Sequence, residues 1–191
     1  MNRHVAWIVL ICLLLGAAGT FQGRLKHQMY DFEVYRVAGV RAAAGESLYR
    51  VEDGHWQFKY FPAFALAIVP VAQLPPMTAR AVWLALSVVL LVILVSWSAS
   101  LLPGRRHSAL FVAGFASLAL GKFFIRELGL GQSNILMAVL VLSAVASWRA
   151  KRDGAAGVLL AAATIVKPYA VLFLPYLLLR RGARGAAACL G

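Results

Sequence analysis

Long apolar segments separated by short basic clusters restrict the fold of this chain more than any other feature. The first segment covers residues 5–21, and residues 81–102 form an uninterrupted apolar run. A helix needs about 20 apolar residues to cross the hydrocarbon layer of a bilayer. Charged residues make up only 14% of the chain, whereas soluble domains carry roughly 25%. The sequence therefore predicts an all-α, multi-pass membrane protein, and it excludes a soluble globule or a disordered chain.

The basic residues are distributed as in a membrane protein rather than a nucleic-acid-binding one. The chain carries 19 Lys and Arg residues against 7 Asp and Glu residues. Many of the basic residues form clusters next to apolar runs, at 105–106, 149–152 and 180–184. Such clusters mark cytoplasmic loops of membrane proteins. We therefore expect the lipid bilayer as a partner, no nucleic acid, and a cytoplasmic position for all three clusters.

The apolar pattern predicts about 6–7 hydrophobic segments in a single membrane domain over residues 1–191. Residues 5–21 are expected to be an uncleaved first span with a cytoplasmic N-terminus, although a cleaved signal peptide is the alternative. Residues 22–57 form an external loop under the positive-inside rule. Residues 58–185 hold the remaining membrane segments. The chain closes on a short apolar stretch, so we expect it to be the truncated part of a larger protein.

Two of the apolar segments are interrupted. Residues 58–76 contain four prolines, and residues 154–179 contain the pair Lys167-Pro168. Prolines are tolerated in membrane helices when neighbouring groups satisfy the backbone. If both segments are incomplete spans, the basic clusters fall more consistently on one side of the membrane.

The external loop contains an amphipathic helix, which we expect from Tyr30 to about Ala44. Phe32, Tyr35 and Gly39 follow helical spacing, and Gly45 is a natural stop. The loop also holds five of the seven acidic residues of the chain.

Asp31 begins this helix just beyond the first span, and two interpretations remain open. A carboxylate at this position can stabilise the N-terminus of the helix. It can also act as a general base on a substrate held at the membrane surface. Glu33 is the neighbouring carboxylate, but it points about 200° away around a helix.

Three further groups of residues are binding candidates, each with a plainer interpretation. His55, Lys59 and Tyr60 belong to an aromatic and cationic strip that suits a sugar or a phosphate, or an ordinary interfacial belt. The stretch 121–134 is expected to be a polar elbow between two apolar helices, and it serves a ligand or is simply a solvated turn. Lys167 pairs with a phosphate or extends its ammonium to the interface. The candidates in the elbow are Lys122, Arg126, Gln132 and Asn134.

Cofactor motifs are absent from the sequence. It contains no Walker loop, no dinucleotide fingerprint and no His-Glu-x-x-His motif. Its two cysteines, Cys12 and Cys189, lack metal-ligand spacing. We therefore expect no cofactor and no metal site, and any energy for group transfer would arrive in a lipid-linked donor.

Taken in order, these motifs resemble one known family over residues 5–185. The pattern is similar to the N-terminal half of glycosyltransferase family 87, the polyprenyl-phosphate-mannose-dependent α-mannosyltransferases of bacterial envelopes. The residues that carry the resemblance are Asp31-Phe-x-Val-Tyr35-x-x-Ala-Gly39, Leu48-Tyr49, Phe58-x-Tyr60-x-Pro62-x-Phe-Ala-Leu66, Pro70, Leu74-Pro75, Ala81-x-Trp83, Gly131-Gln-x-Asn134, Ala156-Gly157, Lys167-Pro168 and Leu177 to Arg181.

The resemblance implies a GT-C membrane fold in a bacterial plasma membrane, with the active loop on the extracytoplasmic side. It implies inverting transfer of a hexose, commonly mannose, from a polyprenyl-phosphate donor to an envelope glycolipid or glycan acceptor. The family's general base falls on Asp31. The donor-phosphate and substrate-binding candidates are Tyr35, His55, Lys59, Tyr60, Lys122, Arg126, Gln132, Asn134 and Lys167.

Two other functions compete with the transferase. Proline-broken helices and charges within the membrane also suit a carrier or flippase subunit for lipid-linked sugars. The third hypothesis is an inactive, truncated fragment.

Overall fold

The computed structural model describes residues 29–102, 104, 106–173 and 175. All regular structure in these residues is helical, which confirms the predicted all-α class for the described part of the chain. The expected first span, the start of the external loop and the basic cluster at 180–184 lie outside it. The elements are α2 (Tyr30–Ala43), η1 (Val51–Trp56), α3 (Pro62–Ala72), α4 (Pro76–Leu101), α5 (Ala109–Leu130), α6 (Asn134–Arg149), α7 (Asp153–Val166) and η2 (Pro168–Phe173).

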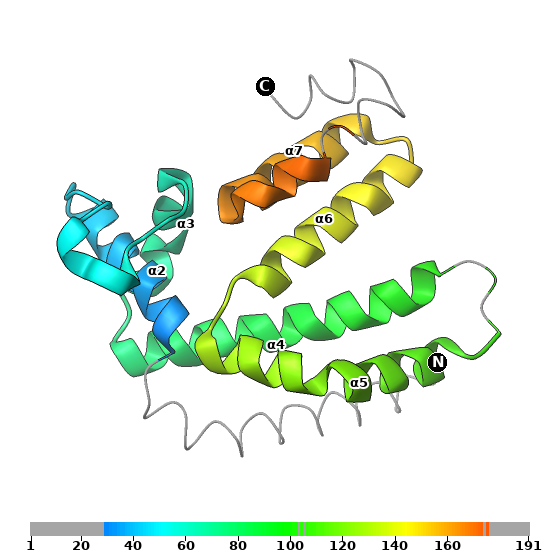
Figure 1. Ribbon diagram of the computed structural model, residues 1–191. Helices are drawn as coiled ribbons and strands as arrows, with labels where there is room; N and C mark the ends of the chain where they lie inside the picture. The colour runs from blue at the N-terminus through cyan, green and yellow to red at the C-terminus, as the bar shows by residue number, and fades with distance from the viewer. Residues whose placement is uncertain (1–28, 103, 105, 174, 176–191) are drawn as a thin grey trace.

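The helices form two hairpins with a smaller helix pair at one end (Figure 1). Helix α4 is antiparallel to α5, and α6 is antiparallel to α7. Because each hairpin reverses the chain, α4 and α6 begin, and α5 and α7 finish, beside α2 and α3. We call this the α2 end. The loops between α4 and α5 and between α6 and α7 lie at the opposite end of the molecule.

Two of the described helices are long and apolar enough to cross a membrane, namely α4 with 26 residues and α5 with 22. At 1.5 Å per residue they extend over about 39 and 33 Å, against a hydrocarbon layer of about 30 Å. Helix α5 buries none of its residues within the described structure, as expected for a surface in contact with lipid. Helices α3, α6 and α7 are shorter apolar helices of 11, 16 and 14 residues.

The proline positions explain where several elements begin and end. Pro62 and Pro76 stand at the first positions of α3 and α4, where a missing N–H costs nothing. Helix α3 has 11 residues, which is too few to span a bilayer. Helix α7 ends at Val166, and Lys167 has extended backbone angles before the 3-10 turn that Pro168 begins. The Lys167-Pro168 pair thus interrupts its segment, as the sequence predicts.

The prediction of a polar elbow over residues 121–134 is wrong in its extent. Residues 121–130 continue α5 as its last turns, and the chain turns only at residues 131–133. Lys122 and Arg126 are exposed on this helix. Long basic side chains can extend from a membrane helix to the interface, so their charge does not require the helix to stop there.

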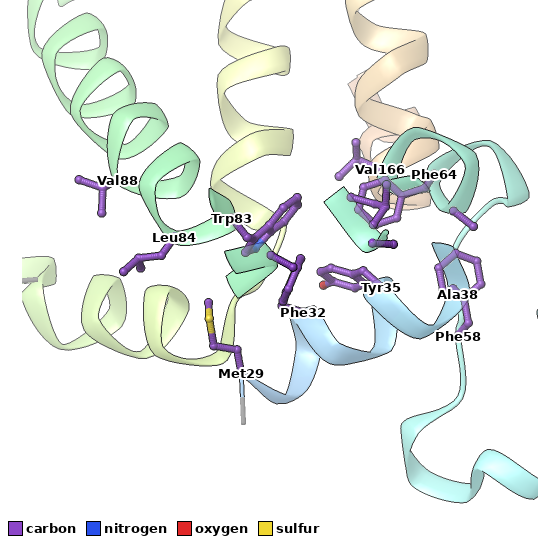
Figure 2. Packing of buried hydrophobic residues seen from close by; sticks show 14 residues of the cluster. Met29, Phe32, Tyr35, Ala38, Phe58, Phe64, Trp83, Leu84, Val88 and Val166 are labelled. Carbon is purple, nitrogen blue, oxygen red and sulfur yellow. The ribbon is translucent and has the colours of Figure 1, made fainter. Parts of the chain in front are cut away.

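The buried core joins α2 and α3 to α4. Figure 2 shows Phe32 and Tyr35 of α2 facing Trp83 of α4. The Phe32 ring stacks on the Trp83 ring with centroids 5.3 Å apart, and the Tyr35 ring meets the same indole edge-on at 5.9 Å. Burying a side chain as large as phenylalanine is worth roughly 1.5–3 kcal/mol. The apolar face of α2 is therefore packed against α4.

Candidate functional site

Asp31 lies in the first turn of α2 but contacts a distant part of the chain. The N-cap residue of α2 is Met29, and no side chain caps the helix. The amide nitrogen Nε2 of Gln132 instead donates a hydrogen bond of 2.7 Å to Oδ2 of Asp31. The carboxylate is thus held against the turn of residues 131–133, and capping alone does not account for its orientation.

Asn134 and Glu127 fix the orientation of the Gln132 amide. Nδ2 of Asn134 donates to Oε1 of Gln132 at 2.8 Å and to Oε2 of Glu127 at 2.9 Å. Glu127 also accepts from the backbone N–H of Asn134 at 2.9 Å. On the other side, the Tyr169 hydroxyl donates to Oδ1 of Asn134 at 3.0 Å. Because the oxygen of Gln132 already accepts a hydrogen bond, its NH₂ group is directed at Asp31.

Lys167 reaches the same turn through two tyrosines. Its Nζ donates to the Tyr60 hydroxyl at 3.2 Å and lies 4.9 Å from the centre of the Tyr60 ring. The hydroxyls of Tyr60 and Tyr35 share a hydrogen bond of 3.1 Å, and the Ser133 hydroxyl donates to the Tyr35 oxygen at 3.4 Å. Burial, and then the neighbouring Tyr60, raise the pKa of Tyr35. Tyr35 therefore stays neutral, and the chain of hydroxyls holds Lys167 by hydrogen bonds.

The turn itself is fixed by close packing. Gly131 has φ 69° and ends α5 in the left-handed conformation, which glycine adopts most readily. A Cβ atom on Gly131 would lie 2.6 Å from Cβ of Phe32. The Trp83 indole N–H donates to the Gly131 carbonyl oxygen at 2.9 Å. The glycine thus lets α2 approach the turn that carries Gln132.

Glu33 is occupied by ion pairs. Its Oε1 accepts from Arg36 at 2.6 Å, and its Oε2 lies 3.4 Å from a guanidinium nitrogen of Arg80. Burial acts to raise its pKa, but the hydrogen bonds and charges of the two arginines outweigh it and lower that pKa. Asp31 has no such cation among its described contacts, so the two neighbouring carboxylates differ in environment.

A comparison with protein families covers most of this site. The model of glycosyltransferase family 87 matches residues 58–191, which is more than half of the chain. The chain belongs to glycosyltransferase family 87. Comparisons with curated proteins and with solved structures find no match.

The matched region of this family 87 glycosyltransferase contributes most of the site residues. Tyr60, Gln132, Asn134 and Lys167 fall within it, whereas α2 lies N-terminal to it. The fold brings both parts together at the α2 end. We call the assembled group the polar cluster, which consists of Asp31, Tyr35, Tyr60, Glu127, Gln132, Ser133, Asn134, Lys167 and Tyr169.

Four of the sequence candidates lie outside the polar cluster. His55 and Lys59 are exposed in and after η1, and Lys122 and Arg126 are exposed on α5. The His55 ring meets the Trp56 ring edge-on at 4.9 Å. Among the described residues, no group of three or more His, Cys, Asp or Glu side chains is arranged to hold a metal ion.

Sequence reasoning missed three members of the polar cluster as site residues. Ser133 lies between two residues that the pattern did single out, and Tyr169 follows Lys167 by two positions. Glu127 lies in the stretch predicted to be a polar elbow but was not among its candidates; it forms two hydrogen bonds with Asn134. Proximity to the motif residues was the available signal for Ser133 and Tyr169.

Proposed function

We propose that this family 87 glycosyltransferase moves a hexose, with mannose as the first candidate, from a polyprenyl-phosphate donor to an extracytoplasmic glycolipid or glycan acceptor. The observation that carries the proposal is the convergence of a carboxylate and an ammonium group on one turn. Asp31 is hydrogen-bonded to Gln132, and Lys167 is connected through Tyr60 and Tyr35 to Ser133. Transfer from a phosphate donor requires a base for the acceptor and a positive charge for the leaving group.

In the proposed reaction, Asp31 accepts the proton of the acceptor hydroxyl as the hydroxyl oxygen attacks the anomeric carbon. Gln132 holds Oδ2 of Asp31, and the other oxygen, Oδ1, takes the proton. The bond from the anomeric carbon to the phosphate oxygen breaks, and its electron pair leaves on the phosphate. Attack opposite the leaving group inverts the anomeric configuration. Lys167, oriented by Tyr60, compensates the negative charge that develops on the polyprenyl phosphate.

The distribution of basic residues favours an extracytoplasmic position for the α2 end. Four of the seven exposed Lys and Arg residues in the described part of the chain lie at the opposite end, in and beside the loops that join α4 to α5 and α6 to α7 (Figure 1). Under the positive-inside rule these loops face the cytoplasm. Helix α4 then runs inwards and α5 outwards, and the polar cluster faces the extracytoplasmic side of a multi-pass protein in a bacterial plasma membrane. The four residues at the opposite end are Arg106, Arg149, Lys151 and Arg152.

The test is the substitution Asp31→Asn in the full-length protein, with Glu52→Gln as a matched control. Asparagine keeps an oxygen that can accept the hydrogen bond of Gln132 but loses the basic site. Glu52 is an exposed carboxylate of η1, so its change to an amide controls for loss of negative charge. We expect sugar transfer from a polyprenyl-phosphate mannose to fall by about 10²–10⁴-fold in Asp31→Asn, the range of general base catalysis.

Membrane insertion and thermal stability are measured in the same preparations. Normal transfer by Asp31→Asn would refute the assignment of the base. Failure of the unaltered protein to form any product, together with movement of the lipid-linked sugar across vesicles, would favour a carrier over a transferase.

A further inference from the structure

A cavity of about 300 Å³ opens on the side of α2 that faces η1. This is the lower end of the size range of small-molecule sites. The cavity is separate from the hydrogen bonds of the polar cluster. Its lining residues are Tyr30, Glu33, Val34, Val37, Arg41, Asp53, Trp56 and Phe58.

One wall of the cavity is aromatic and partly open to solvent. The Tyr30 and Trp56 rings are stacked, with centroids 5.0 Å apart and an angle of 15° between their planes. Their exposed fractions are 44% and 46%, so each ring keeps accessible surface after stacking on the other. Aromatic residues that combine an apolar face with a polar edge are typical of binding sites.

The polar part of the cavity lining is an ion pair that joins α2 to η1. Two guanidinium nitrogens of Arg41 donate to the two carboxylate oxygens of Asp53 at 2.5 and 2.8 Å. The pair is bidentate, which fixes the orientation of both groups. An arginine has five N–H donors, and each carboxylate oxygen accepts more than one hydrogen bond. The pair therefore retains donors and acceptors for the hydroxyl groups of a ligand.

The position of Asp31 on α2 relates this cavity to the proposed reaction. At 100° per residue, Tyr35 lies about 40° from Asp31 in one direction around the helix. Tyr35 is connected to Lys167 through the hydroxyl of Tyr60. Tyr30 and Arg41 lie about 80–100° from Asp31 in the other direction. The proposed base thus stands between the side that holds the ammonium group and the side that holds the cavity.

We propose that this cavity binds a pyranose ring of the acceptor, beside the sugar or lipid that carries the reacting hydroxyl. The proposal rests on the proposed function, because it assigns the side of Asp31 away from Lys167 to the acceptor. A pyranose has an apolar face of C–H groups, which packs on Trp56 or Tyr30, and a rim of hydroxyls, which Arg41 and Asp53 hydrogen-bond. The combination of a stacked aromatic wall and a bidentate ion pair matches both surfaces.

The test fills the cavity with Val37→Phe and uses Val40→Phe as the matched control. Both valines belong to α2, but Val37 lines the cavity and Val40 is exposed outside it. In the full-length protein, we expect Val37→Phe to raise the KM for the acceptor about tenfold or more, because the added ring occupies the space of the pyranose and removes its contacts with the cavity walls. The KM for the donor and kcat should change less than twofold, and Val40→Phe should behave as the unaltered protein.

A direct binding measurement separates this proposal from the transfer reaction. Saturation-transfer NMR with methyl α-mannopyranoside is recorded on the unaltered protein, on Asp31→Asn and on both valine variants. We expect binding to survive in Asp31→Asn and Val40→Phe and to be lost in Val37→Phe. Trp56→Ala, which truncates a half-exposed ring, should lose binding without disturbing the core.

The outcomes are distinguishable. Binding that is blocked by Val37→Phe in a protein without transferase activity would keep the subsite and refute the proposed function. Equal binding by Val37→Phe and Val40→Phe, or no binding of the glycoside to the unaltered protein, would overturn the subsite. Binding of octyl phosphocholine but not of the glycoside would assign the cavity to an alkyl chain and overturn it as well.

Discussion

Replacing Gly131 with alanine tests the idea that the turn between α5 and α6 sets the position of Gln132 against Asp31. The added Cβ would lie 2.6 Å from Cβ of Phe32, and ordinary contacts begin at 3.4 Å. The shortfall is about 0.8 Å. Cβ of Phe32 is fixed to the α2 backbone and cannot rotate away, so α2 and the turn must separate. A displacement of that size along the hydrogen bond of 2.7 Å between Gln132 and Asp31 would stretch it beyond normal length.

The control is Gly45→Ala, which has the same backbone strain without the overlap. Gly45 has φ 68° and Gly131 has φ 69°, but a Cβ on Gly45 meets nothing within 4 Å. The left-handed conformation costs alanine about 1–2 kcal/mol at both positions. Both substitutions also reduce the conformational entropy of the unfolded chain, which stabilises the two variants to a similar extent. Overpacking adds about 1–3 kcal/mol at Gly131 alone. In a chain of this size, 1 kcal/mol corresponds to roughly 2–4 °C.

We therefore expect Gly131→Ala to melt roughly 2–12 °C below Gly45→Ala, measured by intrinsic fluorescence of the purified full-length protein. Gly131→Ala should also lose sugar transfer at temperatures where it is still folded, because Asp31 no longer meets Gln132. Equal melting temperatures and equal activities for the two variants would show that α2 does not pack against the turn as described, and the reasoning would fail.

Two further predictions concern how α2 is held. In Gly39→Ala the new Cβ would lie 2.7 Å from Cβ of Ala72, so we expect a lower melting temperature. In Gly121→Ala, where the helix surface is open, helix propensity should raise stability by up to about 1 kcal/mol; the same sign for both would contradict the packing of α2 on α3. The second prediction is acid sensitivity at Glu33, whose pKa is lowered from 4.5 by two arginines despite burial. A lowered pKa stabilises the folded state above 4.5 and loses that effect as the pH falls through the lowered value. Between about pH 6 and 3, the melting temperature should therefore fall less steeply with decreasing pH in Glu33→Gln than in the unaltered protein.

The sequence predicted local structure well where a single helix and its stop determine it. The helix expected from Tyr30 to about Ala44 is found at Tyr30–Ala43, because the spacing of Phe32 and Tyr35 and the glycine at position 45 are local signals. The break at Lys167 was also predicted, since proline acts on its own neighbours. The end of α5 was not predicted. Its last turns contain charged residues, and such a stretch cannot be distinguished by composition from a solvated turn.

The sequence singled out some residues of the polar cluster, but it did not indicate how they are arranged. Asp31 and Gln132 are separated by 101 positions, and Tyr60 and Lys167 by 107. No local pattern indicates such a pairing, because it depends on how two hairpins place their ends. His55, Lys59, Lys122 and Arg126 had chemistry as suitable as that of Lys167, yet they are exposed outside the polar cluster.

What separates the two groups of candidates is the connection to the turn at residues 131–133. Each side chain of the polar cluster belongs to that turn or is connected to it by one to three hydrogen bonds. Trp83 and Gly131 fix the turn against α2. Preorganised groups act more strongly on a developing charge than mobile ones, because they need not reorient during the reaction. An exposed lysine such as Lys59 can attract a phosphate, but its position is not fixed. Lys167 is held by the Tyr60 hydroxyl and ring. For this reason we propose Lys167, rather than one of the exposed cations, as the group that acts together with Asp31 on the substrate.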